Sequence, residues 1–158
     1  MGAVYLWQTQ YEPALAEMER AIALNPNSAV GYAFLAEALS RVGRSEEAVT
    51  MAEQALRRKS FAVDQQVGTA YYLAGRPEEA IAPLKRYLTR YPNILDAHLT
   101  LAAVYNEVGR EAEARAEAAE VLRINPQFSL EVHRERAPIK DPTMLARHLA
   151  ALRKAGLK

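Results

Sequence analysis

The side chains best suited to acid–base chemistry are two glutamate pairs, Glu46-Glu47 and Glu78-Glu79. Each pair follows a Gly-Arg step and opens an apolar helical pattern, so both are expected in first helical turns. Adjacent residues on a helix do not face each other, and negative charge at a helix N-terminus offsets the helix dipole. We therefore interpret the pairs as surface charges that stabilise helix starts, and we expect no catalytic residues.

Histidine is the next candidate, as a metal ligand. The only imidazoles are His98, His133 and His148, and no two of them are four residues apart. No carboxylate cluster accompanies them, and the chain has no cysteine. These absences argue against a metal site, a disulfide and a Cys nucleophile. We expect no metal, and a packed or half-buried His98.

Glycine turns are the third candidate, as phosphate-binding loops. They occur at Gly43-Arg44, Gly75-Arg76 and Gly109-Arg110, but none has the G-x4-G-K-[ST] pattern of a phosphate loop. Glycine reaches positive φ without strain, so these turns are interpreted as helix C-caps. No cofactor and no enzymatic activity are expected.

The composition indicates one domain, or an array that behaves as one. The chain has 158 residues, 50% of them hydrophobic, and a net charge of +1. The first ten residues contain neither a basic segment nor a long apolar run, which argues against a signal peptide. The longest uncharged stretch, 21–36, is interrupted by Asn25-Pro26 and is unsuited to a membrane span. We expect a soluble, cytoplasmic protein without membrane partners.

An internal repeat is the strongest pattern in the chain. The alanines that follow an acidic pair or its equivalent recur at intervals of 34, 32 and 34 residues, at Ala14, Ala48, Ala80 and Ala114. Prolines stand at the ends of three units, but the one expected near Ser60 is absent, and the linker there is two residues short. The chain therefore divides into four units, the first of them truncated, at 1–26, 27–60, 61–92 and 93–126.

Each unit reads as two helices. Apolar residues at helical spacing precede each Gly-Arg turn, for example Tyr32, Leu35 and Leu39, and acidic residues follow it. Basic residues end the later helices, and an Asn-Pro or Pro-Asn step separates units. Nothing reads as a strand, so the predicted class is all-α.

The repeat resembles the tetratricopeptide repeat, a 34-residue helix-turn-helix unit with the pattern W-x2-L-G-x2-Y, then A-x3-F, then P. In the third unit the matching residues are Val67-Gly68, Tyr71, Ala80, Leu84 and Pro92. Asp64 and His98 depart from the pattern, because they occupy aromatic positions. HEAT and armadillo units are the alternatives, but they need about 40 residues or more. The resemblance implies a right-handed superhelical solenoid of these units.

A solenoid of this kind has an extended concave surface lined by the first helix of each pair. Counting along those helices predicts a peptide groove formed by Val30, Ala33, Glu37, Arg41, Gln65, Thr69, Tyr72, Asp96, Leu99, Ala103 and Asn106. In chaperone-binding members of the resembled family, Lys, Arg and Asn at such positions clamp a peptide's carboxylate. This lining has almost no Lys or Arg, which favours a short neutral peptide or a neighbouring domain. Interface energy concentrates in aromatic and arginine side chains, so Tyr72 and Arg41 are the expected hot spots.

The last residues, 127–158, leave the period and are expected to form C-terminal capping helices, with a docking surface as the alternative. Asp141-Pro142 is a helix-start signal, and Leu145, Leu149 and Leu152 form one apolar stripe. The segment 128–158 holds 7 basic and 3 acidic residues, against 13 and 16 in 1–127. It contains almost no aromatic residue to stack bases, so we expect a solvated basic face rather than a nucleic-acid site.

The tail also resembles the C-terminus of bacterial multidomain proteins in which tetratricopeptide repeats follow a class III adenylate or guanylate cyclase domain. The resemblance lies in Asn125 to Leu130, in Lys140-Asp141-Pro142 and in Leu152 to Leu157. It implies the non-catalytic repeat region of such a protein, or a free-standing relative.

Three functions are therefore predicted. The first is a non-catalytic protein-interaction or scaffold module, and the second is a regulatory segment of a nucleotide cyclase protein. The third is homodimerisation through the truncated first repeat, which would expose the apolar side chains of Met1, Tyr5, Leu6 and Trp7.

Overall fold

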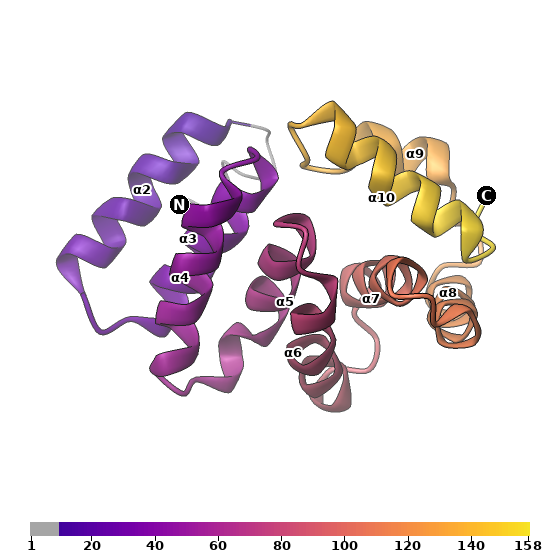
Figure 1. Ribbon diagram of the computed structural model, residues 1–158, viewed down its shortest axis with the longest axis horizontal. Coiled ribbons are helices and arrows are strands. Elements are labelled where there is room, and N and C mark those ends of the chain that lie inside the picture. Colours follow the sequence, from indigo (N-terminus) through magenta and orange to yellow (C-terminus); the bar gives the residue numbers. More distant parts are fainter. Residues whose placement is uncertain (1–9) are drawn as a thin grey trace.

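The structure, a computed structural model, describes residues 10–158 (Figure 1). Its helices are α2 (Tyr11–Leu24), α3 (Ala29–Arg41), α4 (Ser45–Arg57), α5 (Asp64–Leu73), α6 (Pro77–Arg90), α7 (Leu95–Glu107), α8 (Glu111–Ile124), α9 (Leu130–Arg136) and α10 (Pro142–Lys154), with a short 3-10 helix, η1 (Phe61–Val63). No strand occurs in this part of the chain, so the predicted all-α helical-repeat class is confirmed. The predicted dimerisation surface at Met1, Tyr5, Leu6 and Trp7 lies outside the described residues.

The helices pack as successive hairpins. Helix α3 packs on α4, α5 on α6 and α7 on α8, and neighbouring hairpins meet through α3 with α5 and α6 with α7 (Figure 1). Gly43, Gly75 and Gly109 form the turns with φ of +85°, +80° and +78°. In each turn the N–H of the following arginine donates to a carbonyl five residues earlier, as Arg76 does to Tyr71. This bond satisfies a carbonyl that the helix end leaves without a partner.

The arginine after each glycine has a second role at the start of the next helix. Arg44, Arg76 and Arg110 form ion pairs with Glu47, Glu79 and Glu113 respectively, three residues further on. These pairs are well exposed, so each contributes little stability on its own. The second glutamate of each candidate pair, Glu47 and Glu79, is thus held by the arginine that precedes its helix.

The second junction is built differently from the others. Helix α4 ends at Arg57, and Lys59 in the turn that follows has a φ of 48°. The short helix η1 then leads directly into α5 without a proline. Arg58 secures this junction, because its guanidinium donates to the Pro26 carbonyl and lies 4.0 Å from the centre of the Tyr32 ring. These two contacts tie the end of α4 to the α2–α3 loop and to α3.

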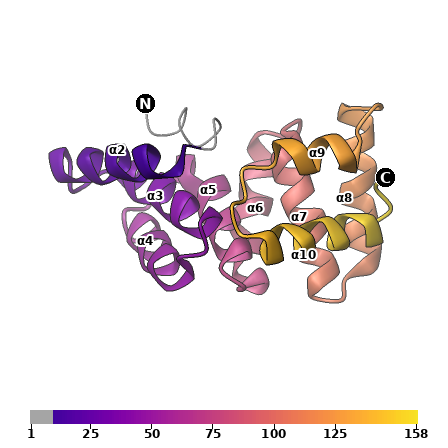
Figure 2. The ribbon, with the colours of Figure 1, turned by 90° about the horizontal axis from the view of Figure 1, so that it is seen from above.

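The C-terminal segment turns back over the repeats. Helix α10 packs on α7 and beside α9, and Figures 1 and 2 show the two tail helices side by side over the concave side of the stack. The linker before α10 reaches α3, where Lys140 N donates to Arg41 O at 2.9 Å. The tail therefore does more than cover α7 and α8, since it spans the concave face as far as the α3 hairpin. No helix of residues 10–158 is both long and apolar enough to cross a membrane.

Candidate functional site on the concave face

Most of the predicted groove residues are buried, and the tail covers several of them. Val30 is exposed, and Gln65 and Asp96 are partly exposed. The other eight are buried, and they are Ala33, Glu37, Arg41, Thr69, Tyr72, Leu99, Ala103 and Asn106. The concave face is thus a packed surface in this structure rather than an open channel.

Arg41 anchors the extended part of the tail, residues 137–141, at the end of α3. Its guanidinium donates to Glu37 Oε1 at 2.6 Å and to the Pro138 carbonyl at 3.5 Å. Its own carbonyl accepts from Lys140 N. Arg41 is only 6% exposed, so this charge is held by a carboxylate one turn away and by main-chain carbonyl oxygen. Removing one partner of a buried ion pair lowers the free energy of unfolding by about 3–5 kcal/mol, because the remaining charge is left buried without compensation.

The centre of the face holds a chain of polar side chains from three helices. Tyr72 Oη lies 3.1 Å from His148 Nδ1, and His148 Nε2 lies 3.1 Å from His133 Nε2. Burial lowers the pKa of His148 to about 3, and the neighbouring His133 and the arginines Arg41 and Arg147 act in the same direction. Burial also lowers the pKa of His133. Both imidazoles are therefore neutral at pH 7, and each can donate through one nitrogen and accept through the other.

The far end of the face binds the main chain of α10 and one of its arginines. Asn106 Nδ2 donates to Ala151 O at 2.9 Å. Arg147 donates to Tyr72 O at 2.9 Å, and its Nε lies 2.9 Å from Glu107 Oε1. Burial raises the pKa of Glu107, and the charge of Arg147 opposes that rise. These contacts fix α10 along α7 in one register.

Little space remains between the tail and the face. The residual cavity has a volume of about 30 Å³ and is lined by side chains of both, among them Thr69, Tyr72, Leu99, Ile139 and His148. A space of that size holds at most a water molecule or two. Residues 137–154 therefore occupy the concave face as a ligand would.

Sequence reasoning missed His148 as the partner of Tyr72, although a signal was present. His148 follows Leu145 by three residues and precedes Leu152 by four, so it lies on the same side of the helix as these two leucines. A polar residue on an apolar stripe is buried with the stripe, and a buried polar group needs a hydrogen-bond partner. Among the described residues, no group of histidines and carboxylates has the arrangement to hold a metal ion.

His98 is the third histidine, and it lies in α7 away from this chain of contacts. Its Nδ1 is 2.6 Å from Glu117 Oε2 and its Nε2 is 2.9 Å from the Pro92 carbonyl oxygen. Burial lowers its pKa, but the hydrogen bonds to Glu117 and Pro92 outweigh this, so the pKa is raised overall. Both ring nitrogens face a hydrogen-bond acceptor, which favours the imidazolium form, in which both nitrogens donate. It is a packed histidine that replaces an aromatic residue of the repeat pattern.

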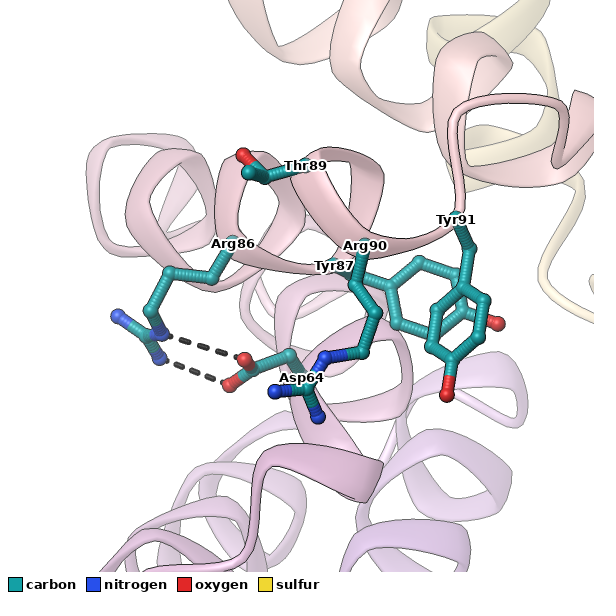
Figure 3. Close-up of a pocket in the computed structure, with 6 residues that line it drawn as sticks. All are labelled: Asp64, Arg86, Tyr87, Thr89, Arg90 and Tyr91. Atoms are coloured by element: carbon teal, nitrogen blue, oxygen red, sulfur yellow. Dashed lines mark hydrogen bonds and ion pairs between the residues drawn. The ribbon is translucent and has the colours of Figure 1, made fainter.

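A separate pocket of about 360 Å³ lies beside α6 (Figure 3). Asp64, the other departure from the aromatic pattern, is 3% exposed, and its carboxylate accepts two hydrogen bonds from Arg86, at 2.8 and 3.2 Å. The Tyr87 and Tyr91 rings line the pocket with their centres 5.0 Å apart. Arg86 binds both carboxylate oxygens of Asp64. The two residues therefore form a structural ion pair between α5 and α6, and we do not interpret Asp64 as a general acid or base.

The arrangement of helices is similar to that in several proteins of known structure. Residues 71–137 match the tetratricopeptide repeat family. A thermophilic tetratricopeptide repeat protein of Thermus thermophilus superimposes with a TM-score of 0.67 at 21% identity, covering 96% of this chain and 95% of that one. The chain has the tetratricopeptide-repeat fold.

Two further structures share this tetratricopeptide fold. MamA of Desulfovibrio magneticus RS-1 gives a TM-score of 0.65 at 16% identity, covering 98% of this chain and 92% of that chain. YrrB, described as a tetratricopeptide protein with an unusual peptide-binding site, gives a TM-score of 0.63 at 21% identity. The match covers 98% of this chain and 80% of that one. No curated protein sequence matches the chain.

Proposed function

We propose that this chain is a non-catalytic protein-interaction module whose concave face binds an α-helical segment of a partner or of a neighbouring domain. The observation that supports this is the seating of residues 137–154 on that face. The tail presents an extended stretch followed by a helix, and side chains of α3, α5 and α7 hold both parts. A partner segment of the same form would find the same contacts.

The contacts suggest how such a segment would be selected. Arg41 and Asn106 bind main-chain carbonyl oxygens of the tail, so they recognise its backbone rather than particular side chains. Ile139 and His148 instead fill the space beside Thr69, Tyr72 and Leu99, where shape and polarity matter. We therefore expect an aliphatic residue before the helix and a neutral polar residue on its buried stripe to be the main sequence requirements.

A partner would have to compete with the tail. The tail is part of the same chain, and its effective concentration at the face is on the order of millimolar. The apparent affinity of a partner is reduced by the small fraction of molecules whose tail is released. Weakening the tail without changing the face should consequently strengthen the binding of an added segment.

The experiment uses a labelled peptide of residues 137–154 and the full chain. The variant Ile139→Ala with Leu152→Ala weakens the tail, and we expect it to bind the peptide at least about tenfold more tightly than the unmodified chain. Adding Arg41→Ala should remove most of that gain. Leu122→Ala, at an exposed leucine of α8, is the control and should change nothing. Equal peptide binding by all four proteins would contradict the proposal.

Two narrower roles rest on sequence resemblance and pattern alone. One is regulation within a protein that carries a nucleotide cyclase domain, and the other is homodimerisation through the N-terminal residues. Both are compatible with an interaction module of this fold. The reading frame around Met1 tests the first, and light scattering across a range of concentrations tests the second.

A further inference from the structure

A second cleft lies between the two tail helices and shares no lining residue with the concave face. It has a volume of about 560 Å³. Figure 2 shows α9 and α10 running beside each other at the C-terminal end. The lining residues of the cleft are Ser129, Leu130, Glu131, Arg134, Leu149, Arg153, Leu157 and Lys158. The small cavity between the tail and the concave face is lined by other residues of the same segment, namely His133, Ala137, Pro138, Ile139 and His148.

The apolar lining of this cleft consists of three leucines that are packed firmly in the protein core. Leu130, Leu149 and Leu157 are 5%, 8% and 1% exposed, so they belong to the packed core and show only a small part of their surface. The N–H of Leu130 donates to the Lys158 carbonyl at 2.8 Å, which ties the last residues to the start of α9. The cleft therefore has a fixed apolar floor onto which an aliphatic side chain can pack.

The rim of the cleft is positively charged. Arg134, Arg153 and Lys158 are exposed and lie around the leucines, with Glu131 as the one acidic lining residue. None of the three basic side chains forms an ion pair within the described residues. The arginines at the repeat turns differ, because Arg44, Arg76 and Arg110 each pair with a glutamate three residues further on. The rim thus carries a net positive charge, from three basic side chains against one glutamate.

We propose that this cleft is a docking site for an acidic amphipathic segment of a partner protein. An aliphatic side chain of the segment packs on Leu130, Leu149 and Leu157, and its carboxylates pair with Arg134 and Arg153. Charge complementarity of this kind guides association and fixes the register of the bound segment. A protein segment is favoured over nucleic acid, because no aromatic residue lines the cleft to stack bases. The proposal is independent of the concave face.

The test uses the full chain and a labelled peptide composed of glutamate and leucine, with a lysine and leucine peptide as the probe of opposite charge. We expect the acidic peptide to bind with a dissociation constant below about 100 μM and the basic peptide not to bind. Arg134→Glu with Arg153→Glu should weaken the acidic peptide by at least about tenfold. The matched control is Arg57→Glu with Arg136→Glu, which makes the same change in net charge at exposed arginines outside the cleft, and it should weaken binding by less than about twofold.

Three outcomes would overturn the proposal. The first is the absence of acidic-peptide binding to the unmodified chain. The second is equal weakening by the two charge-reversed pairs, which would mean that net charge alone attracts the peptide. The third is tighter, Arg134-dependent binding of a single-stranded oligonucleotide than of the peptide, which would make the cleft a nucleic-acid site. Circular dichroism of each variant checks that the helices are retained.

Discussion

The Tyr72 hydroxyl of α5 lies 3.1 Å from His148 Nδ1 of α10, although 76 residues separate the two along the chain. The contact joins the middle of the repeat stack to the middle of the tail. Both side chains are buried, with exposed fractions of 1% and 6%. A hydrogen bond between two buried groups matters chiefly because losing one partner leaves the other unsatisfied.

Tyr72→Phe tests how strongly this contact holds the tail. The substitution keeps the ring and removes the hydroxyl, so His148 Nδ1 loses its partner at unchanged shape. We expect the free energy of unfolding to fall by about 1–3 kcal/mol. Tyr91→Phe, at a tyrosine that is 45% exposed, is the control and should cost less than about 0.5 kcal/mol. Urea unfolding measures both, and equal values for the two variants would show that the hydroxyl contact contributes nothing.

The second prediction concerns acid. The pKa of His148 is lowered from its ordinary 6.5 to about 3, so the docked tail holds this side chain neutral. A released or unfolded tail takes up a proton below pH 6.5, whereas the docked one does not until about pH 3. The neutral His148 therefore contributes its full share to the free energy of tail docking above pH 6.5. This contribution is lost progressively as the pH falls from 6.5 towards 3.

Several charged or titratable groups face this histidine. His133 lies on α9, Arg41 on α3 and Arg147 on α10, and all three disfavour a proton on His148. Amide hydrogen exchange in α10, corrected for the intrinsic effect of pH, should show less protection at pH 5 than at pH 7.5, with α6 as the internal reference. His148→Gln should reduce this difference. Unchanged protection of α10 at pH 5 would contradict the prediction.

The third prediction has the opposite sign and concerns His98. Its pKa is raised, because the hydrogen bonds to Glu117 and Pro92 outweigh the effect of burial. The stability that it contributes is complete below the ordinary pKa of 6.5 and is lost as the pH rises through the higher pKa of the folded state. Thermal unfolding between pH 6 and pH 9 should show this loss in the unmodified chain. Glu117→Gln should flatten the profile, and an equally steep profile in that variant would count against the assignment.

The fold could be predicted from the sequence because each repeat carries its own local signals. Gly75 marks a turn, Pro92 marks the end of a unit, and Ala80 recurs at the repeat interval, so every unit supplies independent support. The same counting brought Arg41 and Tyr72 to one face, since position along a helix decides which side a residue lies on. Nothing local indicated that residues 137–154 would cover that face. A contact between segments 76 residues apart depends on the curvature of the whole stack, which pattern reading along the chain does not supply.

Polar substitutions at aromatic positions were visible in the sequence but their partners were not. Asp64 meets Arg86 and His98 meets Glu117, and in both cases the partner lies on the second helix of the same hairpin. The partners are 22 and 19 residues away, which a hairpin brings together. Two polar residues at such a spacing are therefore a usable signal for a buried ion pair in place of an aromatic contact.

The last prediction concerns the close packing of α5 on α6. A Cβ added to Gly68 would lie 2.5 Å from Leu84 Cγ and 3.3 Å from the Ala80 carbonyl oxygen, which is too close for the present packing. Alanine favours a helix interior over glycine by about 1 kcal/mol, but overpacking a core costs about 1–3 kcal/mol. We expect Gly68→Ala to lower the free energy of unfolding. Leu84 is fully buried, so Leu84→Ala should lower it by about 2–5 kcal/mol.

The double variant decides whether the two residues act as a pair. At the corresponding positions of the other hairpins the chain has Ala36 with Ala52 and Ala102 with Ala118, all of them buried. Gly68→Ala with Leu84→Ala recreates this alanine–alanine arrangement, so the alanine at 68 no longer meets a leucine and partly fills the space that the leucine leaves. The double variant should therefore be more stable than the sum of the single changes implies, by about 1 kcal/mol or more in a double-mutant cycle. Strict additivity of the two single effects would mean that Gly68 is not needed to accommodate Leu84.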